Sequence, residues 1–170
     1  MPDTPACHFA DSPTVLAALA TLVQKDGVSL GGLTPAQLAA ALGLAACTVP
    51  ADAVLREAEV NAALQRALGE TCSFLGTDHV ELRRWLIDAG WLRRDGFGRA
   101  YQRVAMPDLS PAQAQIAVAL NSVDPVGWTS AVREQWARLR AQRKTAWMGR
   151  QSRVAPAPGA ESDPDARGRT

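Results

Sequence analysis

The chain has 170 residues, of which 47% are hydrophobic and 21% are charged. This length suffices for one ordinary domain or two very small ones, and it excludes a large barrel enzyme. No apolar run approaches the roughly 20 residues that a bilayer-spanning helix needs. Residues 1–12 have neither the basic start nor the apolar core of a targeting signal, so we expect a soluble cytoplasmic protein with no membrane partner.

The charges are unevenly distributed, although the formal net charge is only +1. Residues 1–80 contain 3 basic against 8 acidic side chains, whereas residues 81–153 contain 13 basic against 6 acidic ones. A cationic region attracts polyanions by Coulomb steering and counterion release. This distribution makes nucleic acid a candidate partner, and solvated helix faces are the alternative.

The residues that usually carry catalysis or bind metal are sparse. The three cysteines, Cys7, Cys47 and Cys72, form no CxxC pair, which fits neither a disulfide framework nor a zinc site. The sequence places no nucleophile or partnered carboxylate beside His79, which fits a surface or capping residue. The glycines also lack the spacing of phosphate-binding loops. The sequence therefore predicts no metal, no cofactor and no enzymatic activity.

The first predicted elements are helical. Residues 1–12 are rich in Asp and Pro and read as a flexible leader. From Thr14 to Lys25, apolar side chains recur at steps of three and four, which predicts an amphipathic helix that ends at Asp26-Gly27.

A second short helix is predicted shortly after the first. Thr34 suits its N-cap, Pro35 its first helical position and Gly43 its C-terminal stop. Together, the two helices predict a segment similar to a helix-turn-helix over residues 13–47. A helical hairpin with no binding role is the alternative.

Two further helices and a hairpin are predicted in the middle of the chain. Val54 to Leu68 carries an apolar stripe and predicts a helix of about three turns. After a loop, Asp78 suits the N-cap of a helix that runs to Ala89. One side of this helix is the predicted core and consists of Leu82, Trp85, Leu86 and Ala89. The other side consists of Val80, Arg83, Arg84 and Ile87. 

Two short strands follow Gly90, which ends that helix. Residues 91–94 and 99–104 are predicted to pair around the turn Asp95-Gly96, with a positive φ at Gly98.

The remaining predicted elements are again helical. Ser110 caps and Pro111 begins a helix that is expected to bury three apolar side chains, Ile116, Val118 and Leu120. Asp124-Pro125 introduces a longer helix over about 127–150. Residues 151–170 have too little apolar content to order themselves and read as a disordered tail.

The string AEVNAAL, followed by LRRWLIDAGWLRRDGFGRAYQRV, resembles a bacterial family of domains of unknown function, number 2087. The resemblance covers about Val54 to Val104. The chain departs from the family pattern in three places. Arg56 stands where a Thr-like N-cap is expected, the loop over 69–77 is longer than usual, and Gln102 replaces an aromatic residue. The resemblance implies a winged-helix domain of the kind commonly described as a transcriptional regulator.

The expected fold is therefore mainly α with a small β-hairpin, in which flanking helices surround a winged-helix-like domain. The expected boundaries are 13–47 for the N-terminal helical segment, 53–104 for the winged-helix-like domain and 108–150 for the C-terminal helices.

The candidate contacts to double-stranded DNA are arginines on the second helix of this domain and on its wing. An exposed Arg there can donate to guanine or to phosphate. The set is Arg83, Arg84, Arg93, Arg94, Arg99 and Arg103. Structural roles are the alternative: Glu81 and Asp88 can pair with Arg84, and Arg83 can pin the hairpin to the helix.

The C-terminal helix carries an apolar stripe at steps of four, four and three residues. Its members are Trp128, Val132, Trp136 and Leu139. Such a stripe is most often core or a partner-helix surface, so it is a candidate interface for a homodimer. A protein-interaction module without a nucleic-acid role is the alternative function.

Overall fold

The structure is a computed structural model that describes residues 12–154. The chain divides into a first compact unit that ends at Trp136 and a second that begins at Ala137. Of the predicted leader, only Ser12 falls within the described part; of the predicted tail, only residues 151–154 do, as the end of a helix. No helix among the described residues has both the length and the apolar character needed to cross a membrane.

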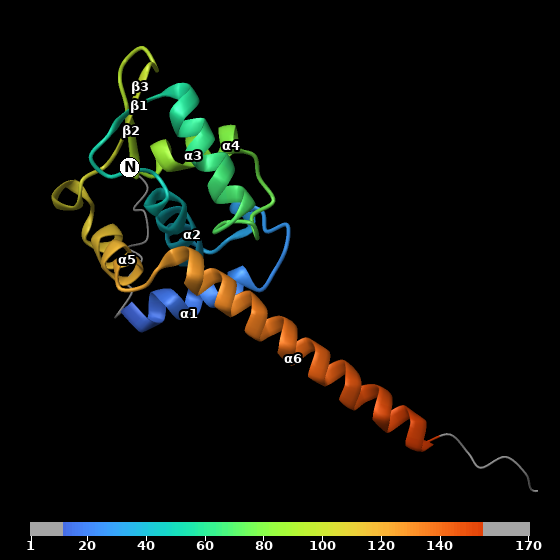
Figure 1. The fold of residues 1–170 in the computed structure, drawn as a ribbon. Coiled ribbons are helices and arrows are strands. Elements are labelled where there is room, and N and C mark those ends of the chain that lie inside the picture. The colour runs from blue at the N-terminus through green and yellow to red at the C-terminus, as the bar shows by residue number, and fades with distance from the viewer. Residues whose placement is uncertain (1–11, 155–170) are drawn as a thin grey trace, which may run out of the picture. The chain divides into compact units, whose positions relative to one another are not determined.

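The first unit is mainly helical and contains a small antiparallel sheet (Figure 1). In chain order its elements are α1 (Ser12–Val23), η1 (Leu30–Gly32), α2 (Pro35–Cys47), β1 (Val54–Arg56), α3 (Glu57–Gly69), α4 (His79–Asp88), β2 (Leu92–Arg94), β3 (Ala100–Arg103), η2 (Met106–Asp108), α5 (Pro111–Asn121) and the first part of α6 (Pro125–Val154). This confirms the predicted fold class.

The elements from α2 to β3 form the winged-helix-like domain. Its three helices and three strands follow in the order α2-β1-α3-α4-β2-β3, and the sheet has the order β1-β3-β2. Within it, Leu55 pairs with Tyr101 and Arg94 pairs with the same tyrosine from the other side. Helix α2, which was predicted to belong to a separate N-terminal segment, packs mainly against α1 and α5 and also contacts α4.

Strand β1 was not predicted, because Val54–Arg56 was read as the start of a helix. The helix begins only at Glu57, with Arg56 at its N-cap. The carboxylate of Glu59 accepts hydrogen bonds from the Arg56 backbone N–H at 2.7 Å and from its guanidinium at 3.3 Å. The carboxylate at the third helical position thus satisfies the N-cap amide, whereas Arg56 supplies no side-chain acceptor of the kind a Thr-like cap would.

The helix starts that were predicted at Thr34, Asp78 and Ser110 are confirmed. Thr34 and Ser110 each accept a hydrogen bond from the backbone of the glutamine three residues later. Asp78 accepts from the N–H groups of Val80 and Glu81, both at 2.8 Å. Each cap satisfies amide donors that would otherwise be unpaired at a helix N-terminus.

Gly43 was predicted to end α2, but the helix continues to Cys47. A Cβ atom at this position would lie 2.5 Å from Ile116 Cγ2 and 3.1 Å from two ring atoms of Trp91. Gly43 is therefore a site of close approach between α2, α5 and the start of the wing.

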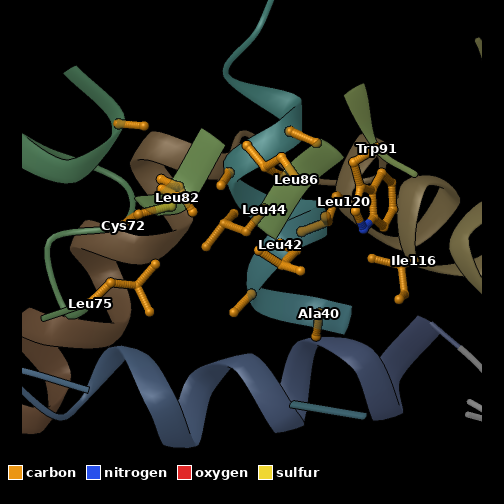
Figure 2. Packing of buried hydrophobic residues seen from close by; sticks show 14 of the residues in the cluster. Ala40, Leu42, Leu44, Cys72, Leu75, Leu82, Leu86, Trp91, Ile116 and Leu120 are labelled. Atoms are coloured by element: carbon orange, nitrogen blue, oxygen red, sulfur yellow. The ribbon is translucent and has the colours of Figure 1, made fainter. Parts of the chain in front are cut away.

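The core is continuous across the first unit. Leu42, Leu44, Leu82, Leu86 and Ile116 are all buried, and Figure 2 shows them around α2 together with Trp91 and Leu120. Helix α1 packs against both α2 and α5. It contributes four buried side chains, Val15, Leu19, Leu22 and Val23.

Helix α5 corrects one predicted core residue. Ile116 and Leu120 are buried as expected, but Val118 is 53% exposed. The buried residues of α5 are spaced as on one face of a helix. The predicted set, in contrast, took every second residue, which is the spacing of a strand.

The segment between α3 and α4 is held in place by the core. Phe74 is fully buried, and its carbonyl accepts a hydrogen bond from the Val28 N–H at 2.8 Å. The Val28 carbonyl in turn accepts from Gly76 at 2.9 Å. This short backbone pairing ties the inter-helix loop to the segment that follows α1.

The first part of α6 belongs to the first unit. Trp128 and Val132 are partly buried and pack against the core. Arg133 donates to Asp26 Oδ1 at 2.6 Å and to the Val23 carbonyl at 3.3 Å, both at the end of α1. The helix continues into the second unit, where every residue from Ala137 to Arg150 is exposed.

Candidate nucleic-acid interface

Helix α4 is the second helix of the helix-turn-helix part of the domain, and Arg84 lies on its exposed face. Within residues 12–154, Arg84 makes no ion pair with Glu81 or Asp88. The Glu81 carboxylate instead accepts from Thr77 Oγ1 at 2.7 Å and from Trp85 Nε1 at 3.4 Å. The ion pairs considered for Arg84 are therefore not formed, and its guanidinium faces solvent.

Arg83 is directed into the domain, and its side chain is only 12% exposed. Its guanidinium forms an ion pair with Glu57 at 2.9 Å and donates to Asn61 Oδ1, both on α3. It also lies 5.2 Å from the centroid of the Tyr101 ring on β3. Arg83 thus holds α4 against α3 and the wing, and its guanidinium is not on the surface.

The wing turn is built by Asp95. Its carboxylate accepts hydrogen bonds from the backbone N–H groups of Arg99 at 2.7 Å and Ala100 at 3.2 Å. The hydrogen bond from the Ala100 amide holds the pKa of Asp95 below its usual value. Gly98 closes the turn with a φ of 69°. The carboxylate therefore faces its own turn, which explains why an acid is present in an arginine-rich hairpin.

Two wing arginines extend from this turn. Arg94 and Arg99 are exposed, and neither pairs with a carboxylate in the part of the chain that the structure describes. The Arg99 guanidinium lies 4.8 Å from the centroid of the Phe97 ring. Phe97 itself is 80% exposed at the tip. The tip thus presents an exposed aromatic ring in contact with one cation, Arg99.

Phe97 was not predicted as a site residue. The signal was present in the sequence, because a tight turn needs Asp and Gly but does not need an aromatic side chain. Only its exposure shows that the ring does not help to build the core.

The other two wing arginines have partners within the first unit. Arg93 forms an exposed ion pair with Asp108 at 3.2 Å. Arg103 is half-buried and donates to the Val49 carbonyl at 3.2 Å. Of the six predicted contacts, Arg84, Arg94 and Arg99 are therefore available to a ligand. Arg93 is available when a weak surface pair opens.

The predicted interface stripe is divided by the structure. Trp128 and Val132 pack against the core, and Trp136 is half-buried. Leu139 is exposed in the second unit. The stripe is consequently core at its start, and only its end lies on the surface.

An open pocket of about 320 Å³ lies between α2, α3 and the start of α6. Its lining includes Cys47, Arg66 and Glu70. Burial raises the pKa of the Cys47 thiol, and a protonated thiol is a weak nucleophile. His79 lies away from these groups, beside Gln65. Among the described residues no three side chains are grouped so that they could hold a metal ion.

Comparison with known proteins extends the resemblance toward the N-terminus. Residues 35–103 match the family model described as "Uncharacterized protein conserved in bacteria (DUF2087)". The match begins at the first residue of α2 and ends at the last residue of β3. No match was found among curated proteins or among solved structures. Residues 35–103 of this chain are thus similar to the bacterial DUF2087 family.

Proposed function

We propose that the protein binds double-stranded DNA through α4 and the wing, and acts in the cytoplasm as a non-enzymatic transcriptional regulator. The observation that carries the proposal is the placement of Arg94 and Arg99. Both are exposed on the hairpin, and neither forms an ion pair within the described residues.

The helix-turn-helix arrangement supplies the geometry for this proposal. In such units the second helix enters the major groove while neighbouring segments contact the backbone. Arg84 lies on the exposed face of α4, where it can donate to a base edge or to a phosphate. The wing arginines then act mainly on phosphates, which set affinity and orientation without reading sequence.

The stacking of Arg99 on Phe97 supports a role at the tip. A guanidinium held over a ring face loses fewer conformations on binding, and its N–H groups remain available at the edge. Exposed apolar side chains beside arginines are also used by proteins that enter the minor groove. The pairing is therefore suited to a nucleic-acid contact.

A titration of labelled random duplex at several salt concentrations tests the proposal, with fluorescence anisotropy as the readout. The double variant Arg94→Gln/Arg99→Gln removes two phosphate contacts, so the slope of log K against log salt should become less steep by about 1.8. The control Lys25→Gln/Arg66→Gln removes the same charge from exposed positions outside α4 and the wing and should leave the slope unchanged. Equal slopes for the two variants would contradict the proposal.

A protein-interaction module or homodimer is the second candidate function. The observation behind it is Leu139, the last residue of the predicted stripe, which is 38% exposed in the second unit. Sedimentation distinguishes the two candidates. A dimer at tens of micromolar with no binding to duplex at low salt supports the interaction module, and duplex binding by a monomer supports the DNA-binding proposal.

A further inference from the structure

The second half of α6 carries positive charge without any acidic side chain. From Gln135 to Val154 there are six cations, and neither Asp nor Glu occurs. Helix-surface cations usually pair with carboxylates three or four residues away. Arg140, Lys144 and Arg150 have no carboxylate at that spacing. This is unlike a solvated helix face, where charges of both signs alternate.

Four of these cations share one side of the helix. At about 100° per residue, Arg140, Arg143, Lys144 and Arg150 fall within a sector of about 120°. Trp147 lies in the middle of that sector and is 54% exposed. The sector therefore presents an aromatic ring surrounded by positive charge, over about 15 Å of helix length.

The occupant of this face is expected to be a polyanion. A second copy of the helix would bring two strongly cationic faces together, which costs electrostatic free energy. A membrane-surface helix needs a continuous apolar face. Here Leu139 and Met148 lie about 180° apart around the helix, so the exposed apolar side chains form no such face.

We propose that this sector, from Arg140 to Arg150, is a second nucleic-acid site that binds the phosphate backbone. The inference rests on the proposed function, because it assigns the same class of ligand to a second element. Duplex DNA carries about one phosphate per 3.4 Å of axis on each strand, so a cationic face of about 15 Å lies opposite several negative charges.

Three double variants, each removing two positive charges from the full chain, separate this site from the wing. They are Arg140→Gln/Lys144→Gln on α6, Arg94→Gln/Arg99→Gln on the wing, and the control Lys25→Gln/Arg66→Gln. Each is titrated with random duplex over a series of salt concentrations, and circular dichroism checks that the helix content is unchanged. The α6 variant should make the salt slope less steep by about 1.8 relative to wild type, and the control should not.

The outcomes distinguish the two proposals. If the α6 variant keeps the wild-type slope while the wing variant loses about 1.8, the second site is refuted and the proposed function stands. If only the α6 variant changes the slope, the wing proposal is refuted and the second site stands. Binding to anionic phospholipid vesicles without binding to duplex would overturn the nucleic-acid assignment of α6.

Discussion

Replacing Gly43 by alanine tests the close approach of α2 to α5 and the wing. The added Cβ would lie 2.5 Å from Ile116 Cγ2 and 3.1 Å from the Trp91 ring. Both neighbours are buried, and Ile116 Cγ2 is attached directly to Cβ, so it cannot move without the backbone or the rotamer. We therefore expect the substitution to destabilise the first unit.

The magnitude follows from two opposing effects. Overpacking of a filled core costs about 1–3 kcal/mol, and a contact this short favours the upper end. Alanine in a helix interior is more favourable than glycine by about 1 kcal/mol. The net loss is expected to be about 2 kcal/mol, or roughly 4–8 °C in Tm for a chain of this size.

Urea unfolding followed by circular dichroism measures the change. Gly69→Ala is the matched control, because it lies at the last residue of α3 and nothing is within 4 Å of its added Cβ. Its stability should be unchanged or slightly higher. In an Ile116→Ala background the cost of Gly43→Ala should be largely relieved. A Gly43→Ala protein as stable as the Gly69→Ala protein would refute the packing argument.

Three further predictions concern the neighbouring arginines, the buried thiol and the wing turn. Arg83→Ala should lower stability by about 2 kcal/mol, because it breaks a largely buried charged hydrogen bond and a cation–π contact. Arg84→Ala should leave Tm unchanged, and thermal melts of the two variants check both expectations. Burial raises the pKa of Cys72 to about 12 from an ordinary value of 9.0, so the unfolded chain loses this proton at a lower pH than the folded chain does. The free energy of unfolding should therefore fall as pH rises from 9 toward 12, and it should fall less in Cys72→Ala. The Asp95 carboxylate has a lowered pKa, so its contribution is present above the ordinary value and is lost as pH falls below it; Asp95→Ala should remove that dependence and speed hydrogen exchange at the Ala100 amide.

The sequence was sufficient for the features that depend on local chemistry. The caps at Thr34, Asp78 and Ser110 and the positive φ at Gly98 are confirmed, because each is determined by a few adjacent residues. Features that depend on distant partners were not predicted. Strand β1 is only three residues long and is defined by its pairing with β3, which no periodicity could show.

The same distinction applies to individual side chains. Gly43 has the residue type of a helix stop, and only the position of Ile116 shows that it is a packing glycine. Arg83 and Arg84 are adjacent and chemically identical, and the sequence left both roles open for each of them. Their environments differ because Arg83 faces Glu57 and Tyr101, which come from two other elements.

The Val28–Phe74–Gly76 backbone pairing has a consequence for anyone who wishes to excise the family domain. One partner in each of these contacts lies outside residues 35–103: Val28 in the pairing, the buried face of α1 against α2, and Ile116 beside Gly43. A fragment cut at those boundaries would expose apolar side chains on α2 and leave the carbonyl of Phe74 without its amide donor. We expect such a fragment to aggregate, so a minimal expressible version must keep α1 and α5.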